Sequence, residues 1–168
     1  MKAILMIFAI ATTIACASSK EKKPSLDKEY AAFKNVSTND SLFASAERGF
    51  CFGKCPVYKM NIYNSGYATY EGIRNVEMLG TYSGKFTPQQ MNELIASAEG
   101  ISFFSLDENY DNPNVTDLPS ATMSIVINAK RHQVKYRAKF PPELRVFQTV
   151  FEDMNKEVSW KLEKAFEE

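Results

Sequence analysis

The 168-residue sequence contains a single histidine, and this scarcity limits the catalytic chemistry open to it. A Ser-His or Cys-His dyad would have to use His132, because such dyads need an imidazole as the base. Neither the G-x-S-x-G motif of hydrolases nor the H-E-x-x-H motif of metalloproteases occurs in the sequence. Carboxylates such as Asp107, Glu108 and Asp111 could form a hydrolase site, but sequence does not show which of them share a cleft. We therefore expect a non-catalytic protein and no cofactor.

An excess of charge of one sign is also missing. The chain has 20 Lys and Arg residues against 20 Asp and Glu residues. Proteins that bind nucleic acid usually carry a strongly basic balance or stripe. We therefore expect no nucleic-acid partner.

Only the N-terminus carries a long apolar run, and that run is too short to cross a membrane. Residues 3–11 are apolar, whereas a spanning helix needs about 20 such residues. Lys2 before the run and small residues before Cys16 are typical of a secretory signal peptide and similar to a bacterial lipobox, although Thr13 replaces the usual Leu. An ordinary secreted protein with a spare thiol is the alternative.

This N-terminus predicts the domain organisation and the location. We expect a lipoprotein signal peptide over 1–15, a lipidated Cys16 with a flexible tether over 16–40, and a single domain over 41–168. The lipid would anchor the protein to a membrane of the bacterial cell envelope, facing the periplasm or the cell surface.

Alternating hydrophobicity predicts two hairpins in the domain. Residues 58–63 and 67–71 flank an Asn-Ser-Gly turn, and residues 121–128 and 134–140 form the second pair. A further strand is expected over 80–86. Helices are predicted from Thr87-Pro88 to Gly100 and from Glu143 onward. The expected fold is α+β: an antiparallel sheet of about five strands, built from hairpins and packed on two helices in a two-layer sandwich.

Three motifs resemble those of a bacterial domain of unknown function, family 6438. They are the run Cys-Phe-Gly-Lys-Cys-Pro-Val-Tyr at 51–58, Gly66 with Tyr70 and Gly72, and Thr-Asp-Leu-Pro at 116–119. The resemblance covers residues 41–155. It implies one fold unit and a cell-envelope setting, and because the family has no assigned activity it leaves the function open.

Cys51 and Cys55 allow four interpretations. An even number of thiols in an oxidising compartment favours a disulfide across the short loop. The pattern Cys-x-x-x-Cys-Pro is also similar to the motif of Sco-type copper chaperones, in which case His132 would be the third ligand. Thiol redox exchange and free or intermolecular thiols are the other two.

The sequence also gives two candidate binding surfaces for an unidentified protein or small-molecule ligand. The first is the face of the sheet, with Tyr58, Lys135 and Arg137; the second is the loop at 107–119, with Asp117. Basic residues on the second hairpin could face anionic lipid or an acidic partner, or could simply be solvated. The loop matches only part of a calcium-binding pattern, because Asn112 and Leu118 replace the required Gly and Glu.

Overall fold

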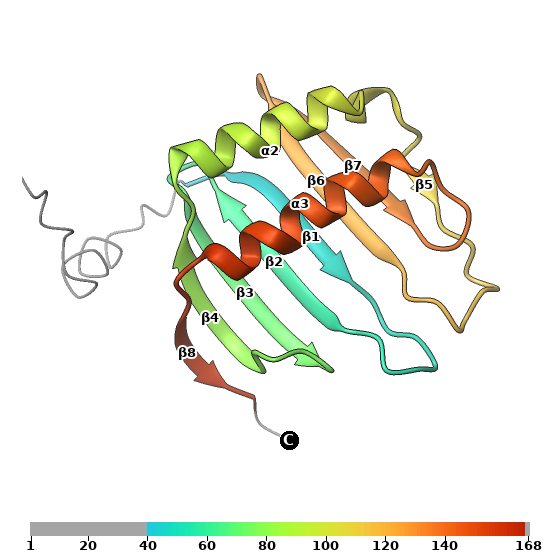
Figure 1. The fold of residues 1–168 in the computed structure, drawn as a ribbon, viewed down its shortest axis with the longest axis horizontal. Helices are drawn as coiled ribbons and strands as arrows, with labels where there is room; N and C mark the ends of the chain where they lie inside the picture. The colour runs from blue at the N-terminus through green and yellow to red at the C-terminus, as the bar shows by residue number, and fades with distance from the viewer. Residues whose placement is uncertain (1–39, 167–168) are drawn as a thin grey trace, which may run out of the picture. The chain divides into compact units, whose positions relative to one another are not determined.

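A computed structural model describes residues 40–166, all within one compact unit. Two α-helices lie on one face of an eight-stranded sheet (Figure 1). The strand order is β5-β7-β6-β1-β2-β3-β4-β8. The strands are β1 (Leu42–Arg48), β2 (Val57–Tyr63), β3 (Tyr67–Arg74), β4 (Gly80–Lys85), β5 (Asn109–Tyr110), β6 (Ala121–Ile127), β7 (Lys130–Tyr136) and β8 (Lys161–Ala165). The helices are α2 (Pro88–Gly100), α3 (Glu143–Glu157) and the 3-10 turn η2 (Phe103–Ser105).

The expectation of a five-stranded antiparallel sheet was wrong. The sheet has eight strands and is mixed, because β5 runs parallel to β7. The three unexpected strands have weak patterns. β1 is rich in small residues, since Ala44 and Ala46 lie at its centre; β5 has two residues; and every residue of β8 is exposed, so it has no buried-exposed alternation.

Both expected hairpins form, and their turns explain their registers. β2 and β3 pair around Gly66, whose φ of +83° is easily adopted only by glycine. β6 and β7 turn through Asn128 and Ala129, both with positive φ. Because the turn has only these two residues, β7 begins directly after it. The strand covers Lys130–Tyr136 instead of the predicted 134–140.

The helices confirm the local signals read from the sequence. Thr87 caps α2 with a complete capping box to Gln90, and Pro88 opens the helix. Apolar side chains of both helices pack on the sheet and are fully buried, among them Leu94, Leu144, Phe147 and Phe151, and Phe103 of η2 joins them. No helix among residues 40–166 is both long and apolar enough to span a bilayer.

The opposite face of the sheet is polar. Ser45 and Ser124 share a hydrogen bond of 2.7 Å between their hydroxyl oxygens, and Ser83 donates one to Glu163. Since no element within residues 40–166 covers this face, the α3 side is the one that holds the core and can form a deep pocket.

Candidate functional site

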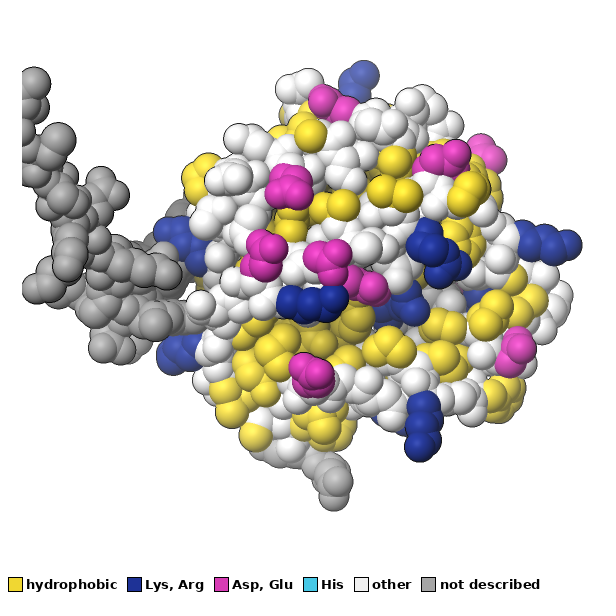
Figure 2. Space-filling model, viewed as in Figure 1, with side chains coloured by type: hydrophobic (Ala, Val, Ile, Leu, Met, Phe, Trp, Pro, Cys, Tyr) yellow, Lys and Arg dark blue, Asp and Glu magenta, His cyan; other side chains and the backbone are white. Residues whose placement is uncertain are grey.

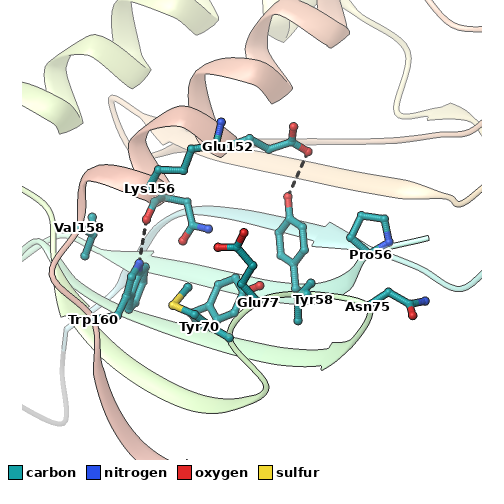
Figure 3. Close-up of a pocket in the computed structure, with 12 residues that line it drawn as sticks. Pro56, Tyr58, Tyr70, Asn75, Glu77, Glu152, Lys156, Val158 and Trp160 are labelled. Carbon is teal, nitrogen blue, oxygen red and sulfur yellow. Dashed lines mark hydrogen bonds between the residues drawn. The ribbon is translucent and has the colours of Figure 1, made fainter. Parts of the chain in front are cut away.

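A pocket of about 660 Å³ opens between the sheet and the C-terminal half of α3. Figure 2 shows hydrophobic side chains reaching the surface in a hollow beside α3, flanked by charged groups. The pocket lies over β2 and β3, and the loop between β3 and β4 forms part of its rim (Figure 3). The lining residues are Pro56, Tyr58, Tyr70, Asn75, Val76, Glu77, Met78, Glu152, Asn155, Lys156, Val158 and Trp160.

Three aromatic rings form the apolar part of the pocket. Tyr58 on β2 and Tyr70 on β3 are stacked with ring centroids 5.5 Å apart, and Trp160 lies 5.7 Å from Tyr70. The indole Nε1 of Trp160 donates to the carbonyl oxygen of Asn155 at 2.9 Å. This hydrogen bond ties the chain after α3 to the helix and keeps the indole at the pocket.

The rim loop depends on Gly72. A Cβ atom at this position would collide with the carbonyl oxygen of Met78 and meet a methyl group of Val76. The loop can therefore fold over β3 only because Gly72 has no side chain. Asn75 adds a second tie, since its Nδ2 donates to the carbonyl oxygen of Cys55 at 3.0 Å.

Glu152 on α3 accepts hydrogen bonds from two neighbouring side chains and forms an ion pair with a third. Gln148 Nε2 donates to it at 2.7 Å, Tyr58 Oη donates at 3.4 Å, and the Arg48 guanidinium lies 3.6 Å away. Gln148 in turn accepts from Tyr136 Oη at 2.7 Å. Burial raises the pKa of Tyr58, and the negative charge of Glu152 raises it further. The raised pKa keeps the Tyr58 hydroxyl a donor to this carboxylate.

Glu77 and Lys156 lie nearer the mouth of the pocket. The carboxylate of Glu77 projects towards the space between Tyr58 and Trp160 (Figure 3). Burial first, then the neighbouring Tyr82 and Glu77, raises the pKa of Tyr70 to about 12. Lys156 turns its nitrogen away from the tyrosines and bonds Asp153 at 2.7 Å.

The cysteine loop closes one end of this region. The sulfur atoms of Cys51 and Cys55 lie at disulfide-bonding distance, with Cα atoms 6.0 Å apart. The loop continues directly into Pro56 at the pocket wall. On its other side, Phe52 N donates to Thr116 O at 3.2 Å, so the cysteine loop lies beside the Thr-Asp-Leu-Pro segment.

His132 does not join the cysteines. Arg48, three residues before Cys51, pairs with Ala121 on β6. His132 pairs with Ile125, which lies four positions farther along the same strand, or about 13 Å at 3.3 Å per residue. Its Nε2 lies 2.9 Å from the carbonyl oxygen of Leu106. The set Cys51, Cys55 and His132, considered above for copper, is therefore not assembled within the described part of the chain, which holds no cluster of three such ligands.

The other candidate binding residues divide between separate places. Tyr58 lies in the pocket, whereas Lys135 and Arg137 both bind Asp111, at 2.9 Å and 2.6 Å. Desolvation alone would raise the pKa of Asp111, but hydrogen bonds and charge from these two cations outweigh it and lower the pKa. Arg137 also donates to the carbonyl oxygen of Val115, so these cations hold the 107–119 loop in place.

Of the two remaining candidates, the structure describes only Asp117. Asp117 is exposed on the loop, outside the pocket. Cys16, the expected lipidation site, lies outside the described residues.

The comparison with known families agrees with the resemblance seen in the sequence. Residues 44–155 match the family described as Domain of unknown function (DUF6438). The chain belongs to this family. No curated protein matches the chain. In this DUF6438 protein the motif residues Pro56, Tyr58, Tyr70 and Gly72 all lie at or beneath the pocket.

Sequence reasoning missed the other half of the DUF6438 pocket. Glu77 lies in a short loop, Glu152 was read only as part of the second helix, and Trp160 follows that helix. The one available signal was Trp160 itself, the only tryptophan in the chain, placed just beyond an amphipathic helix. Arg48 was not found because β1 was not predicted.

Proposed function

We propose that this DUF6438 protein is a non-catalytic binding domain of the bacterial cell envelope, which takes a ligand in the pocket beside α3. The observation that carries the proposal is the pocket of about 660 Å³ with three aromatic side chains in its wall. Ligand sites usually measure about 300–1,000 Å³ and combine apolar walls with a few placed polar groups. This pocket has both properties.

Binding is favoured over catalysis by the state of Glu152. A general base needs a carboxylate whose lone pairs are free to accept a substrate proton. Here Arg48, Tyr58 and Gln148 all contact one oxygen of that carboxylate, Oε1. This oxygen therefore acts as a structural acceptor, which favours a rigid recognition site.

The envelope location rests on two features. The signal-like N-terminus ends in Cys16, and the bonded pair Cys51 and Cys55 suits an oxidising compartment. A protein held at a membrane by acyl chains on Cys16 would face the periplasm or the cell surface.

One experiment with two readouts tests the proposal. The natively processed protein is purified from bacterial membranes, and its intact mass is expected to show a diacyl or triacyl adduct on Cys16. The full chain with Cys16→Ser is then titrated with a set of neutral, anionic and cationic fragments. Because Trp160 is the only tryptophan and lines the pocket, its fluorescence reports binding there directly.

Val76→Phe provides the matched control, since it adds volume without adding a second tryptophan. The Val76 side chain lies over Gly72 and lines the pocket, so a larger residue would fill part of the cavity. Fragments that shift Trp160 emission in the Cys16→Ser chain should lose this effect in the filled variant. An unmodified Cys16 would contradict the anchor, and a fragment response that survives the filling, or no response at all, would contradict the pocket.

A further inference from the structure

We propose that the ligand of this pocket is an organic cation: a primary ammonium or guanidinium group carried on an apolar stem. This inference rests on the proposed binding function and names the chemistry that the pocket selects. Three independent features support it: the charges that face the cavity, the aromatic walls, and one buried acceptor atom.

The charges facing the cavity are negative. The carboxylate of Glu77 projects into the pocket (Figure 3), and no hydrogen bond or ion pair with another residue of the 40–166 segment engages it. Glu152 contributes a second carboxylate at the opposite wall. Lys156, the lysine of the lining, offsets these charges only in part, since it bonds Asp153 at 2.7 Å, turns its nitrogen away from the tyrosines and acts on Glu152 and Glu77 through space alone.

The half-buried Arg48 offsets Glu152 but not Glu77. Arg48 is absent from the pocket lining and pairs with Tyr58 in the register of β1 and β2, with its guanidinium 3.6 Å from Glu152. A carboxylate or phosphate ligand would therefore meet Glu77, while the one cation among the lining residues, Lys156, is bonded to Asp153. Like charges in a partly desolvated cleft repel more strongly than they do in water.

The aromatic walls suit a cation with an apolar stem. The face of an aromatic ring attracts cations, most strongly for Trp and then for Tyr. Tyr58, Tyr70 and Trp160 form one continuous aromatic surface, and Glu77 projects into the space between the first and the last. A stem packed on the rings would bring its charged end to the carboxylate.

A buried acceptor distinguishes an N–H cation from other ligands. Asn155 lines the pocket, and its Oδ1 is buried without a hydrogen-bond donor among the described residues. An unmet buried acceptor costs free energy, and a ligand donor would recover it once rotation of the Asn155 amide turns Oδ1 into the cavity. Primary ammonium and guanidinium groups carry several donors and no acceptor, whereas a quaternary ammonium has no donor to give.

Three ligands that share a phenylbutyl stem and differ in the charge of their end group test the inference. The Cys16→Ser chain is titrated at pH 7 with 4-phenylbutylamine, 4-phenylbutan-1-ol and 4-phenylbutyrate, and Trp160 fluorescence is followed. Charge-assisted hydrogen bonds contribute enough to make the amine bind roughly tenfold or more tightly than the alcohol. The carboxylate should bind most weakly, and added salt should weaken the amine alone.

A pair of charge-matched variants locates the effect. Glu77→Gln should bring amine affinity close to that of the alcohol while leaving alcohol affinity unchanged. Glu71→Gln removes the same charge from an exposed side chain of β3 outside the pocket, and it should leave all three affinities unchanged. Equal losses in both variants would overturn the inference, because they would reflect net charge rather than the site.

The remaining outcomes are equally decisive. If the alcohol or the carboxylate binds at least as tightly as the amine, and Val76→Phe abolishes that binding, the cation inference fails while the pocket function stands. If 4-phenylbutyl-trimethylammonium binds as tightly as the amine, the role of N–H donors fails. Binding of Nα-acetyl-lysine N-methylamide would support the inference with a protein side chain as the source, and binding of the free amine alone would support it with a small metabolite.

Discussion

Gly72 lies beneath the loop that forms the rim of the pocket, and it leaves no room for a side chain. We predict that Gly72→Ala lowers the free energy of unfolding by about 1–3 kcal/mol, because the added methyl group would push the loop backbone at Met78 away from β3. The measurement is urea unfolding followed by circular dichroism, together with Trp160 emission in the native state.

Gly100 supplies the matched control for this substitution. It ends α2, and a Cβ atom there would meet nothing within 4 Å. Gly100→Ala should therefore leave stability unchanged or raise it by up to about 1 kcal/mol. Equal effects of the two substitutions would show that the rim loop does not depend on the close approach at Gly72.

The cysteine loop is an element of its own, closed by the Cys51 and Cys55 sulfurs and joined to the 107–119 loop by a backbone hydrogen bond. We predict that Cys51→Ser/Cys55→Ser lowers the free energy of unfolding by about 2 kcal/mol, the chain-entropy estimate for so short a closed loop. The domain should remain folded, because the core lies under the helices and not under this loop.

Thiol chemistry can be measured on the same pair of proteins. Chemical denaturation reports the stability difference, and disulfide-exchange and copper-binding assays report chemistry. If the double variant keeps full stability while the wild type retains copper or exchanges disulfides, the loop is a reactive site and the structural role assigned to it is wrong.

At this same scale the sequence predicted some elements well and others poorly. The start of α2 was predictable because the capping box between Thr87 and Gln90 is local. β8 was not, because a lysine-rich edge strand with every side chain exposed carries no hydrophobic period. β1 lies at the centre of the sheet, but its small Ala44 and Ala46 resemble a helix as much as a strand.

The candidate site was only half predictable, for a related reason. Tyr58 and Tyr70 belong to motifs that could be seen in the chain. Glu152 and Trp160 reach the same pocket from beyond residue 150, and their roles appear only when α3 packs across β2 and β3. The spacing of residues along the chain does not show which distant segments come together in the fold.

At the scale of the whole molecule, tyrosine side chains lie in the interface between the sheet and the helical layer. Burial raises the pKa values of Tyr58 and Tyr136, and it raises that of Tyr70 to about 12. In the unfolded chain these groups titrate near pH 10. Folding therefore favours their neutral form, and the resulting stability is complete below pH 10 and is lost as pH rises from 10 towards the folded-state values.

We therefore predict that the free energy of unfolding falls steeply between pH 10 and pH 12, as the unfolded chain releases protons that the folded protein keeps. Urea unfolding at a series of pH values measures this slope, and absorbance at 295 nm follows tyrosinate formation. Tyr70→Phe should make the slope shallower, because one of the linked protons is gone. Tyr63→Phe, in the next strand but directed to the polar face, controls for the general loss of a hydroxyl. If the two variants have the same slope as the wild type, alkaline unfolding comes from other groups, and the sheet-helix interface is not what holds these tyrosines neutral.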